Sequence, residues 1–483
     1  METLTLDFDE TQTKLYLKIS NAIRQAIVNG AVMPKEQLPS TRVLAEQLSV
    51  NRHTIMAAYN ELIAQGWVKT KQRQGYSVAD ILPINSALAD KTKHDNTANK
   101  HSWRVIKPSN HDFSRPANEY AFNFAGGNPD IELFPFNEFR SFINDALNRP
   151  SIKALNYGEN NGYEPFIIEV SKYLRRVRAI VNKEIVVVNG TQEALYIIGQ
   201  ILLQSGDCVA VENLGYRPAW NALKNAGAEL IGIKQTDQGI DVADLELLIK
   251  RHNIRLLYLT PLHQYPTTTT ISAQHRVQIY RLAQQYNIPI IEDDYDHEFH
   301  YKSQPLPPMA ANDPSGLVIY LSSFSKIMFP GIRLGVIAVD KSLASHIVSY
   351  RTLINHKANV LLQDAVARWM RDGGFERHLR KATRCYLKRR KCMIDVLNTF
   401  IDEGLTIKFT SPKGGMALWV DVGERAAEIA QLAKELGLFI LAENAFHLHQ
   451  YNDENKFIRL GFAGQSEEKI QQGLKLLKPL LNK

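Results

Sequence analysis

From Tyr120 onward the sequence alternates short apolar segments with longer amphipathic ones, and this rhythm restricts the fold more than any other feature. The apolar segments are six to eight residues long and rich in Val, Ile and Leu, as buried strands are. Helical periodicity marks most of the intervening stretches, for example 192–204 and 273–286. Strands that alternate with helices predict an α/β fold with a parallel, helix-covered sheet. The strand candidates are residues 184–190, 208–214, 229–234, 254–261, 288–294 and 318–324.

The sequence before and after this region predicts further divisions of the chain. Residues 80–118 are polar and show no sustained period, which predicts a flexible linker. Residues 119–340 carry the alternation and form the expected large part of one domain, whereas residues 341–483 mix helices and strands as a smaller α+β part would. A chain of 483 residues is expected to hold two or three domains.

Composition argues against several classes of protein. No apolar run approaches the roughly 20 residues that cross a bilayer, and the first ten residues lack the basic and apolar regions of a signal peptide. Three scattered cysteines, Cys208, Cys385 and Cys392, disfavour a disulfide framework or a zinc site and fit a reducing compartment. We therefore expect a cytoplasmic protein with no membrane partner and no bound metal.

Positive charge is concentrated near the N-terminus. Residues 11–77 contain nine Lys or Arg and three Asp or Glu, so this segment carries +6 of the net charge of +7. Basic side chains gathered in one small segment suit an anionic partner such as DNA.

The same segment has the pattern of a winged helix-turn-helix over residues 11–79. A first helix is predicted over 11–29 because four apolar residues recur at helical spacing, namely Leu15, Ile19, Ile23 and Ile27. Ser40 is a suitable N-cap for a second helix, and Asn51 for a third over 52–65. Two short helices joined by a tight turn, followed by strands at 67–70 and 76–79, complete the motif.

This motif predicts a double-stranded DNA partner. The third helix would present its first residues to the major groove, while the N-terminus of the second helix and the basic wing would meet phosphates. The alternative is a small basic helical domain that binds protein. The residues expected to contact DNA are Ser40, Thr41, Arg42, Asn51, Arg52, His53, Thr54 and Arg73.

Two segments of the following domain place polar groups beside predicted strands. Residues 188–194 join a strand to a helix through a small-residue turn, whose backbone N–H groups can bind a phosphate. Residues 291–296 place carboxylates at the end of an apolar strand, where parallel sheets bind ligands. Taken singly, the first is also a common α/β turn, and the second is also a solvated loop or a metal site with His297 and His300.

Two later segments carry basic side chains. In residues 322–333, Lys326 follows small hydroxyl residues and can form a Schiff base with an aldehyde, while Arg333 can bind a phosphate. In residues 457–463, Arg459 alternates with apolar residues and can pair with a carboxylate. Taken singly, the two segments are equally compatible with a surface loop and a structural salt bridge.

The order of these four segments resembles that of the fold-type I enzymes that use pyridoxal 5′-phosphate (PLP). Residues 38–68 resemble the winged helix of the GntR family over their whole length. Other segments resemble the aminotransferase domain of MocR-type regulators, a GntR subgroup; they are residues 126–135, 155–166, 205–220 and 260–270. The resemblance implies a mainly α winged helix-turn-helix joined to a fold-type I aminotransferase-like α/β domain at 119–483, with a smaller α+β C-terminal subdomain.

The resemblance also implies roles for the matching residues. Lys326 is similar to the lysine that forms the Schiff base with PLP, and Asp293 to the partner of the pyridine nitrogen. Tyr295 is similar to the group near the phenolic oxygen, and Tyr216 to the ring stacked on the pyridine face. Phosphate contacts are implied for Thr191, Gln192, Ser323, Ser325 and Arg333, with Tyr157 reaching the phosphate from a partner subunit and Arg459 binding the effector's carboxylate.

The chain departs from the family at two places. The wing reads RQGYSV where the family has a sequence like GSGTFV. Thr268 stands where the family has Gly, and Tyr265 stands where related enzymes have Asn, so that His263 or Gln264 becomes a candidate cofactor contact. These changes bear more on full aminotransferase turnover than on cofactor binding.

The function implied by the resemblance is that of a head-to-tail homodimeric transcriptional regulator. Its DNA affinity would respond to PLP, or to a small amino compound that forms an external aldimine with PLP. One alternative is a catalytically active PLP-dependent aminotransferase with an auxiliary DNA-binding domain. Another is a cofactor sensor that acts through protein partners.

Overall fold

The structure, a computed structural model, describes residues 14–71, 75–83, 120–156, 159–301, 304–449 and 455–482. Contacts between Cα atoms divide the chain into two compact units, residues 1–105 and 106–483. The predicted linker contains this boundary, and its residues 84–118 lie outside the described residues. None of the helices within the described ranges is long and apolar enough to cross a membrane.

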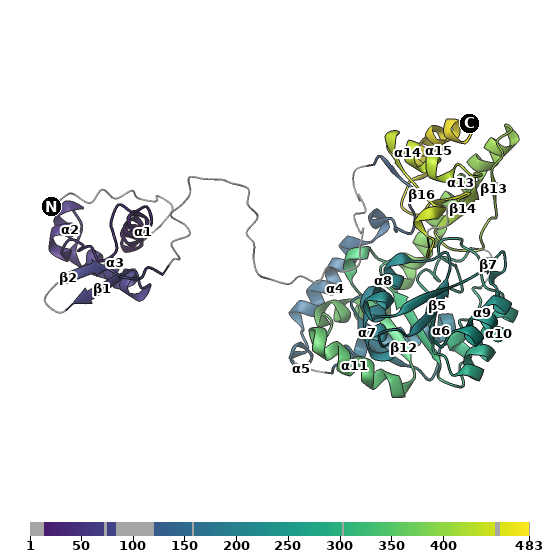
Figure 1. Cartoon of the computed structure of the whole chain (residues 1–483), viewed down its shortest axis with the longest axis horizontal. Coiled ribbons are helices and arrows are strands. Elements are labelled where there is room, and N and C mark those ends of the chain that lie inside the picture. Colours follow the sequence, from purple (N-terminus) through teal and green to yellow (C-terminus); the bar gives the residue numbers. More distant parts are fainter. Residues whose placement is uncertain are drawn as a thin grey trace. The chain divides into compact units, whose positions relative to one another are not determined.

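The N-terminal unit is a winged helix-turn-helix, as predicted (Figure 1). Both predicted caps are present: the Ser40 side chain accepts a hydrogen bond from the Val43 N–H at 3.3 Å, and that of Asn51 from the His53 N–H at 2.8 Å. The strands of the wing are antiparallel and begin and end within a residue of the predicted positions. Its elements are α1 (Leu15–Val28), α2 (Thr41–Gln47), α3 (Arg52–Ala64), β1 (Val68–Lys71) and β2 (Gly75–Val78).

Apolar side chains from all three helices form the core of this unit. Ile19, Ile23 and Ile27 are buried as the helical pattern predicts, whereas Leu15, in the first turn of α1, is 49% exposed. Tyr59 is fully buried, and its hydroxyl donates a hydrogen bond to the Pro39 carbonyl at 2.8 Å. This bond connects α3 to the turn before α2 and so fixes the angle at which α3 is presented.

A seven-stranded sheet forms the centre of the second unit, with strand order β4-β12-β11-β10-β9-β5-β6. The strands β6, β5, β9, β10 and β11 are mutually parallel. All six strands predicted from the sequence run in the same direction, β4 included; β12, which is not among them, is antiparallel to both β4 and β11 and makes the sheet mixed. The strands are β4 (Glu184–Val188), β5 (Cys208–Glu212), β6 (Glu229–Ile233), β9 (Ile254–Leu259), β10 (Ile290–Asp293), β11 (Val318–Ser323) and β12 (Gly335–Val339).

The reversed direction of β12 has a simple cause. Only the short 3-10 helix η4 (Pro330–Ile332) lies between β11 and β12, and a parallel return would need a longer crossover, usually through a helix. Arg333, at the end of η4, has the left-handed φ of 48° that turns the chain back. The loop that carries Lys326 therefore leaves β11 and enters β12 at the same end of the sheet, where the parallel strands have their C-terminal ends.

Helices cover both faces of this sheet (Figure 1). One face packs against α4, α6, α9, α10 and α12, and the other against α7, α8 and α11. The helices are α4 (Phe136–Asn148), α5 (Ile152–Leu155), α6 (Glu164–Arg178), α7 (Thr191–Leu202), α8 (Arg217–Asn225), α9 (Val242–Arg251), α10 (Ala273–Tyr286), α11 (Lys341–Asn355) and α12 (Val360–Arg371), with 3-10 helices η2 (Ile131–Leu133) and η3 (Met309–Asn312) and the small hairpin β7 (Gln235–Thr236) and β8 (Gly239–Ile240).

A smaller α+β part forms the end of the second unit, as predicted, with the antiparallel order β13-β14-β17-β16 (Figure 1). It starts later than residue 341, because α11 and α12 pack on the large sheet and α13 joins the two parts. Its elements are α13 (Gly374–Asp402), β13 (Lys408–Phe409), β14 (Ala417–Asp421), α14 (Ala426–Glu435), β15 (Leu438–Phe439), β16 (Leu441–Ala442), η5 (Glu443–Ala445), β17 (Phe457–Gly461) and α15 (Glu467–Leu481), and β3 (Phe122–Asn123) pairs with β15.

Candidate cofactor site and DNA-binding face

A cavity of about 200 Å³ lies where the central parallel strands end. Thr260 follows β9, Asp293 ends β10 and Ser323 ends β11, so their convergence follows from the common direction of these strands. The nine predicted cofactor residues that the structure describes all line it: Thr191, Gln192, Tyr216, Asp293, Tyr295, Ser323, Ser325, Lys326 and Arg333. The tenth, Tyr157, lies outside the described residues.

Several residues that line the cavity were not predicted from the sequence. They come from the loop before η2, from β9 and the segment that follows it, and from the loop that carries Lys326: Gly126, Gly127, Asn128, Tyr258, Thr260, Tyr265 and Pro330. Tyr258 sits within an apolar strand and gives no sequence signal of a polar role. Gly461 of β17 packs against the backbone of the loop before η2: a Cβ on Gly461 would come within 2.3 Å of the Gly126 Cα, so glycine is required at position 461.

Asp293 is the buried acid at the centre of this cavity. Its Oδ2 accepts a hydrogen bond from the Tyr258 hydroxyl at 2.9 Å, whereas Oδ1 is buried and receives no hydrogen bond from the described residues. Burial raises the pKa of Asp293 to about 7, and the Tyr258 hydrogen bond opposes this increase only in part. A buried carboxylate oxygen without a donor is costly, so it indicates a binding partner that enters from the cavity.

Asp293→Asn is expected to stabilise the cofactor-free protein above neutral pH. The folded carboxyl has a raised pKa and the unfolded one a pKa of about 3.9, so the wild type loses stability as pH rises between about 4 and 7. Asparagine does not titrate and can still accept the Tyr258 hydrogen bond. The variant should exceed the wild type by roughly 2–4 kcal/mol at about pH 8 and differ little at about pH 4. Urea unfolding over this range checks the result, and a difference independent of pH would contradict it.

Lys326 enters the cavity from the loop between β11 and β12. Its Nζ donates a hydrogen bond to the Gly127 carbonyl at 2.5 Å, and its charge partly offsets the raised pKa of Asp293. The same loop is held by the Ser325 N–H, which donates to the Ser323 hydroxyl at 3.1 Å. The lysine and the acid therefore face one cavity from adjacent strand ends, although they are far apart in the sequence.

Groups that bind anions gather at another part of the cavity wall. Thr191 begins α7, so the positive end of this helix faces the cavity. Arg333 lies beside it, and its guanidinium donates to the Asn189 carbonyl at 2.5 Å. Gly190 has a φ of 92°, which side chains rarely adopt, and a Cβ there would lie in a tight contact 3.0 Å from Arg333 Nη2. A helix N-terminus and a guanidinium together form a suitable site for a phosphate.

Arg459 lies behind the wall formed by Gly126 and Tyr265. Its guanidinium carbon is 4.7 Å from the centre of the Tyr265 ring, and its Nη1 donates to the Ala125 carbonyl at 3.1 Å. A Cβ on Gly126 would lie 1.8 Å from this Nη1, so glycine is required there. The side chain is 1% exposed, and its Nε has no hydrogen-bond partner among the described residues. The Arg459 guanidinium is thus held next to the cavity with part of its hydrogen-bonding capacity unused.

His263 and Gln264 do not line the cavity, in contrast to the interpretation of this segment from the sequence. The His263 Nδ1 lies 2.7 Å from the Asp296 Oδ1, and the Gln264 amide donates to Glu212 Oε1 at 3.1 Å. Tyr265 occupies the wall in their place. No group of three or more His, Cys, Asp or Glu side chains is placed to hold a metal ion within the part of the chain that the structure describes.

The predicted DNA-contacting residues gather at the N-terminal ends of α2 and α3, except Arg73, which lies outside the described residues. Arg52 and His53 are exposed in the first turn of α3, and Arg42 is exposed on α2 with Glu46 3.7 Å away. Thr41 differs from the expectation of a surface residue. It is 7% exposed, and its hydroxyl accepts a hydrogen bond from Arg52 Nε at 3.3 Å, so it orients that guanidinium.

Comparison with known proteins assigns both units to families. Residues 15–78 match the model of bacterial regulatory proteins of the gntR family, and residues 123–477 match that of class I and II aminotransferases. The probable rhizopine catabolism regulatory protein MocR of Rhizobium meliloti is 28% identical over 98% of this chain and 95% of its own length. The chain belongs to the MocR-type subgroup of GntR-family regulators.

The aminotransferase-like unit of this MocR-type regulator also resembles free-standing enzymes. Aromatic-amino-acid aminotransferase 1 of Thermococcus litoralis is 30% identical over 74% of this chain and 86% of the enzyme. Kynurenine aminotransferase of Pyrococcus horikoshii, solved in complex with PMP, superposes with a TM-score of 0.70 at 29% identity, covering 76% of this chain and 92% of that one. The fold-type I architecture predicted from the sequence is therefore confirmed.

Proposed function

We propose that this MocR-type regulator binds PLP at Lys326 and that PLP, or an amino compound that reacts with it, alters its affinity for DNA. One observation carries the cofactor part. The described residues predicted to bind PLP, from four separate segments of sequence, line one cavity, and the buried Asp293 Oδ1 within it lacks a donor. A protonated pyridine nitrogen is a donor of the required kind.

The residues of the cavity fit the parts of PLP. Arg333, Thr191 and the N-terminus of α7 would hold the phosphate, and Tyr216 would cover one face of the ring. Asp293 would hold the proton on the pyridine nitrogen, and Lys326 would bond to the aldehyde. When bound, PLP supplies an aldehyde that condenses with amines and a ring that accepts electrons. Arg459, beside the cavity, favours an amino compound that carries a carboxylate.

A homodimer is part of the proposal. Large apolar side chains are exposed on α5 and near the end of α11, where Ile152 is 75% and Leu353 is 82% exposed. These two segments are neighbours, since Lys153 and Lys357 line one hollow. Exposed apolar side chains on neighbouring segments are typical of a protein interface, and a second copy of the chain is the partner that this surface would take.

Arg52→Ala is expected to weaken binding to an operator selected from random DNA by roughly 10- to 100-fold. Arg52 is exposed at the start of α3 and oriented by Thr41, so it is placed to donate two hydrogen bonds to a guanine. Fluorescence anisotropy at fixed salt measures the affinity, with the absorption spectrum of bound PLP as a check that the second unit is unchanged.

Arg52→Lys is the matched control for this experiment. Lysine keeps the charge but loses the planar fork, so the affinity for non-specific DNA should persist while discrimination between operator and non-operator falls. The same titrations with and without PLP test the regulatory part of the proposal. An operator affinity that neither PLP nor any amino compound changes would reject it, and full specificity in Arg52→Ala would reject the assigned role of α3.

Catalytic aminotransferase activity is the second candidate function, favoured by the position of Arg459 next to a cavity that fits PLP. Sustained conversion of an amino donor and a keto acid by the purified protein would support it. A single half-reaction without turnover would instead fit a sensor that reads amino compounds through the cofactor.

A further inference from the structure

Helix α13 carries a dense run of positive charge in the aminotransferase-like unit. Residues 377–394 contain eight Lys or Arg and no Asp or Glu. Two of these cations serve the fold: Arg389 is buried and pairs with Asp130 at 2.7 Å, and Arg390 is buried and donates to the Ser411 hydroxyl at 2.5 Å. The other six are exposed, so their role is not internal packing.

Five of the exposed cations form what we call the α13 basic stripe: Arg380, Lys381, Arg384, Lys388 and Lys391. From 381 onward their spacing is three, four and three residues, which places them along one face of the helix. The sixth, Arg377, pairs with Glu138 and Asp372, both at 2.9 Å. No residue of the stripe forms an ion pair with a described side chain; Asp395 and Glu467 line a hollow with Lys388 and Lys391 but form no ion pair with them.

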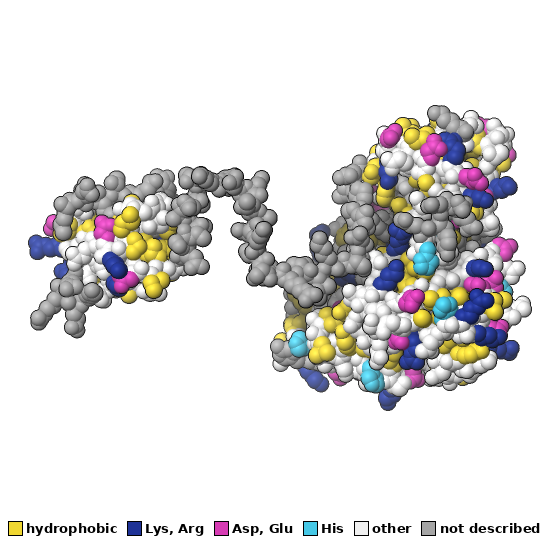
Figure 2. Space-filling view, in the orientation of Figure 1, with side chains coloured by type: hydrophobic (Ala, Val, Ile, Leu, Met, Phe, Trp, Pro, Cys, Tyr) yellow, Lys and Arg dark blue, Asp and Glu magenta, His cyan; other side chains and the backbone are white. Residues whose placement is uncertain are grey.

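The stripe stands out because the charge of this unit is otherwise balanced. Residues 106–483 contain four more basic than acidic residues, and the five cations of the stripe account for this excess, so the rest of the unit is close to neutral. On the face that Figure 2 shows, basic and acidic side chains of the second unit are interspersed. A row of cations about one helical turn, or about 5.4 Å, apart can contact several phosphates of a duplex, because each strand presents a phosphate about every 3.4 Å along the axis.

We infer that the α13 basic stripe is a second DNA-binding surface, which holds backbone phosphates of duplex DNA that flanks the operator. The inference rests on the proposed function, because the winged helix brings DNA to the same protein. It adds a contact that reads no sequence and contributes affinity through counterion release. DNA that extends beyond the operator should therefore bind more tightly than the operator alone.

The test compares full-length wild type with the triple variant Lys381→Gln, Arg384→Gln and Lys388→Gln. Each is titrated with a short duplex that holds only a selected operator and with a long duplex of mixed-sequence flanks. On the long duplex we expect at least about a tenfold loss of affinity at moderate salt, and a slope of log K against log salt that is smaller by roughly 2 to 3. On the short duplex the two proteins should bind alike.

A second triple variant controls for net charge: Lys224→Gln, Lys434→Gln and Lys469→Gln, three exposed lysines on other helices. It should bind both duplexes like the wild type. Equal affinity of wild type and stripe variant for the long duplex would overturn the inference while leaving operator recognition intact. An equal loss in the control variant would also overturn it, as would a stripe effect seen only with phosphatidylserine vesicles. Failure of the wild type to bind any duplex would instead reject the proposed function.

Discussion

Lys326→Ala is expected to abolish covalent attachment of PLP and with it the visible absorption band of the reconstituted protein. Lys326 lines the cavity and provides the amine that would react with the aldehyde of PLP. Its Nζ donates a hydrogen bond to the Gly127 carbonyl, and its charge partly offsets the raised pKa of Asp293. Alanine keeps the backbone and the phosphate-binding groups, so the variant should still hold PLP reversibly but release it on dialysis. Absorbance spectra before and after dialysis measure the effect, which is a complete loss rather than a graded one.

Lys341→Ala is the control for this substitution, because Lys341 is an exposed lysine at the start of α11, away from the cavity lining. It should keep the band. Borohydride reduction of the wild type, which converts the carbon–nitrogen double bond to a stable single bond, should leave the cofactor's mass on the peptide that contains Lys326. A band that survives in Lys326→Ala, or a wild type that stays colourless after incubation with PLP, would refute the cofactor assignment.

Asp293 and Ser323 could be placed at the site from the sequence because each ends a recognisable strand, whereas the roles of the other cofactor residues, including Lys326, were implied by the family resemblance. Parallel strands end at one edge of the sheet, so Asp293 and Ser323 must converge once their strands, β10 and β11, are adjacent. Tyr258 and Gly126 could not be predicted in this way. The Tyr258 hydroxyl reaches Asp293 only because β9 and β10 pair in a particular register, and Gly126 enters the site through the packing of β17.

Two features of the fold differ from the sequence-based expectation for related reasons. The apolar segment of β12 has the composition of its neighbours, and composition carries no information about strand direction. The short connection through η4 decides that direction instead. Likewise, α11 and α12 have amphipathic patterns that are satisfied equally by the large or the small sheet, and only tertiary packing places them on the large one.

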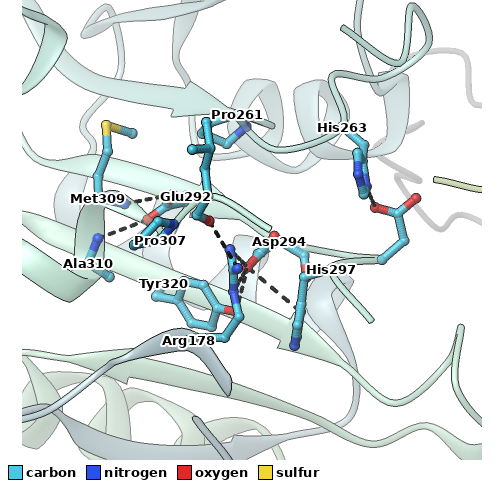
Figure 3. Close-up of polar contacts among 12 residues, drawn as sticks. Arg178, Pro261, His263, Glu292, Asp294, His297, Pro307, Met309, Ala310 and Tyr320 are labelled. Atoms are coloured by element: carbon cyan, nitrogen blue, oxygen red, sulfur yellow. Dashed lines mark hydrogen bonds and ion pairs between the residues drawn. The ribbon is translucent and has the colours of Figure 1, made fainter. Parts of the chain in front are cut away.

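The polar groups behind the cavity also gave no sequence signal. Arg178 ends the run RRVR of α6, where it resembles an exposed cation, yet its side chain is 1% exposed. Successive side chains of β10 alternate between faces, so Asp293 points to the cavity while Glu292 points to the opposite side. There Asp294, next along the chain, meets Arg178, as Figure 3 shows. The position of Asp293 is thus fixed by the ion pair of the next residue, Asp294, on the opposite side of the strand.

Arg178→Ala is expected to destabilise the second unit by about 3–5 kcal/mol, because it leaves a buried carboxylate without its counter-ion. Arg178 Nε donates to Asp294 Oδ2 at 2.8 Å, and the Tyr320 hydroxyl donates to the same oxygen at 2.7 Å (Figure 3). Burial raises the pKa of Asp294, but Arg178 and its other partners outweigh burial and hold it below the usual value. Denaturant unfolding measures the loss, and the affinity for PLP should fall as the neighbouring Asp293 becomes less well placed.

Arg176→Ala provides a matched comparison on the same helix. Arg176 pairs with Glu376 at 2.5 Å, but its side chain is 61% exposed, so this substitution should cost no more than about 1 kcal/mol. The two variants should also differ in their response to pH. The pair Arg178–Asp294 stabilises the wild type above about pH 4 and is lost as pH falls through the lowered pKa, whereas the unpaired Asp294 of Arg178→Ala takes up a proton more readily. The deficit of Arg178→Ala should therefore be smaller at about pH 5 than at about pH 8. Equal losses in the two variants, or a deficit that grows on acidification, would show that the buried pair does not hold the strand end.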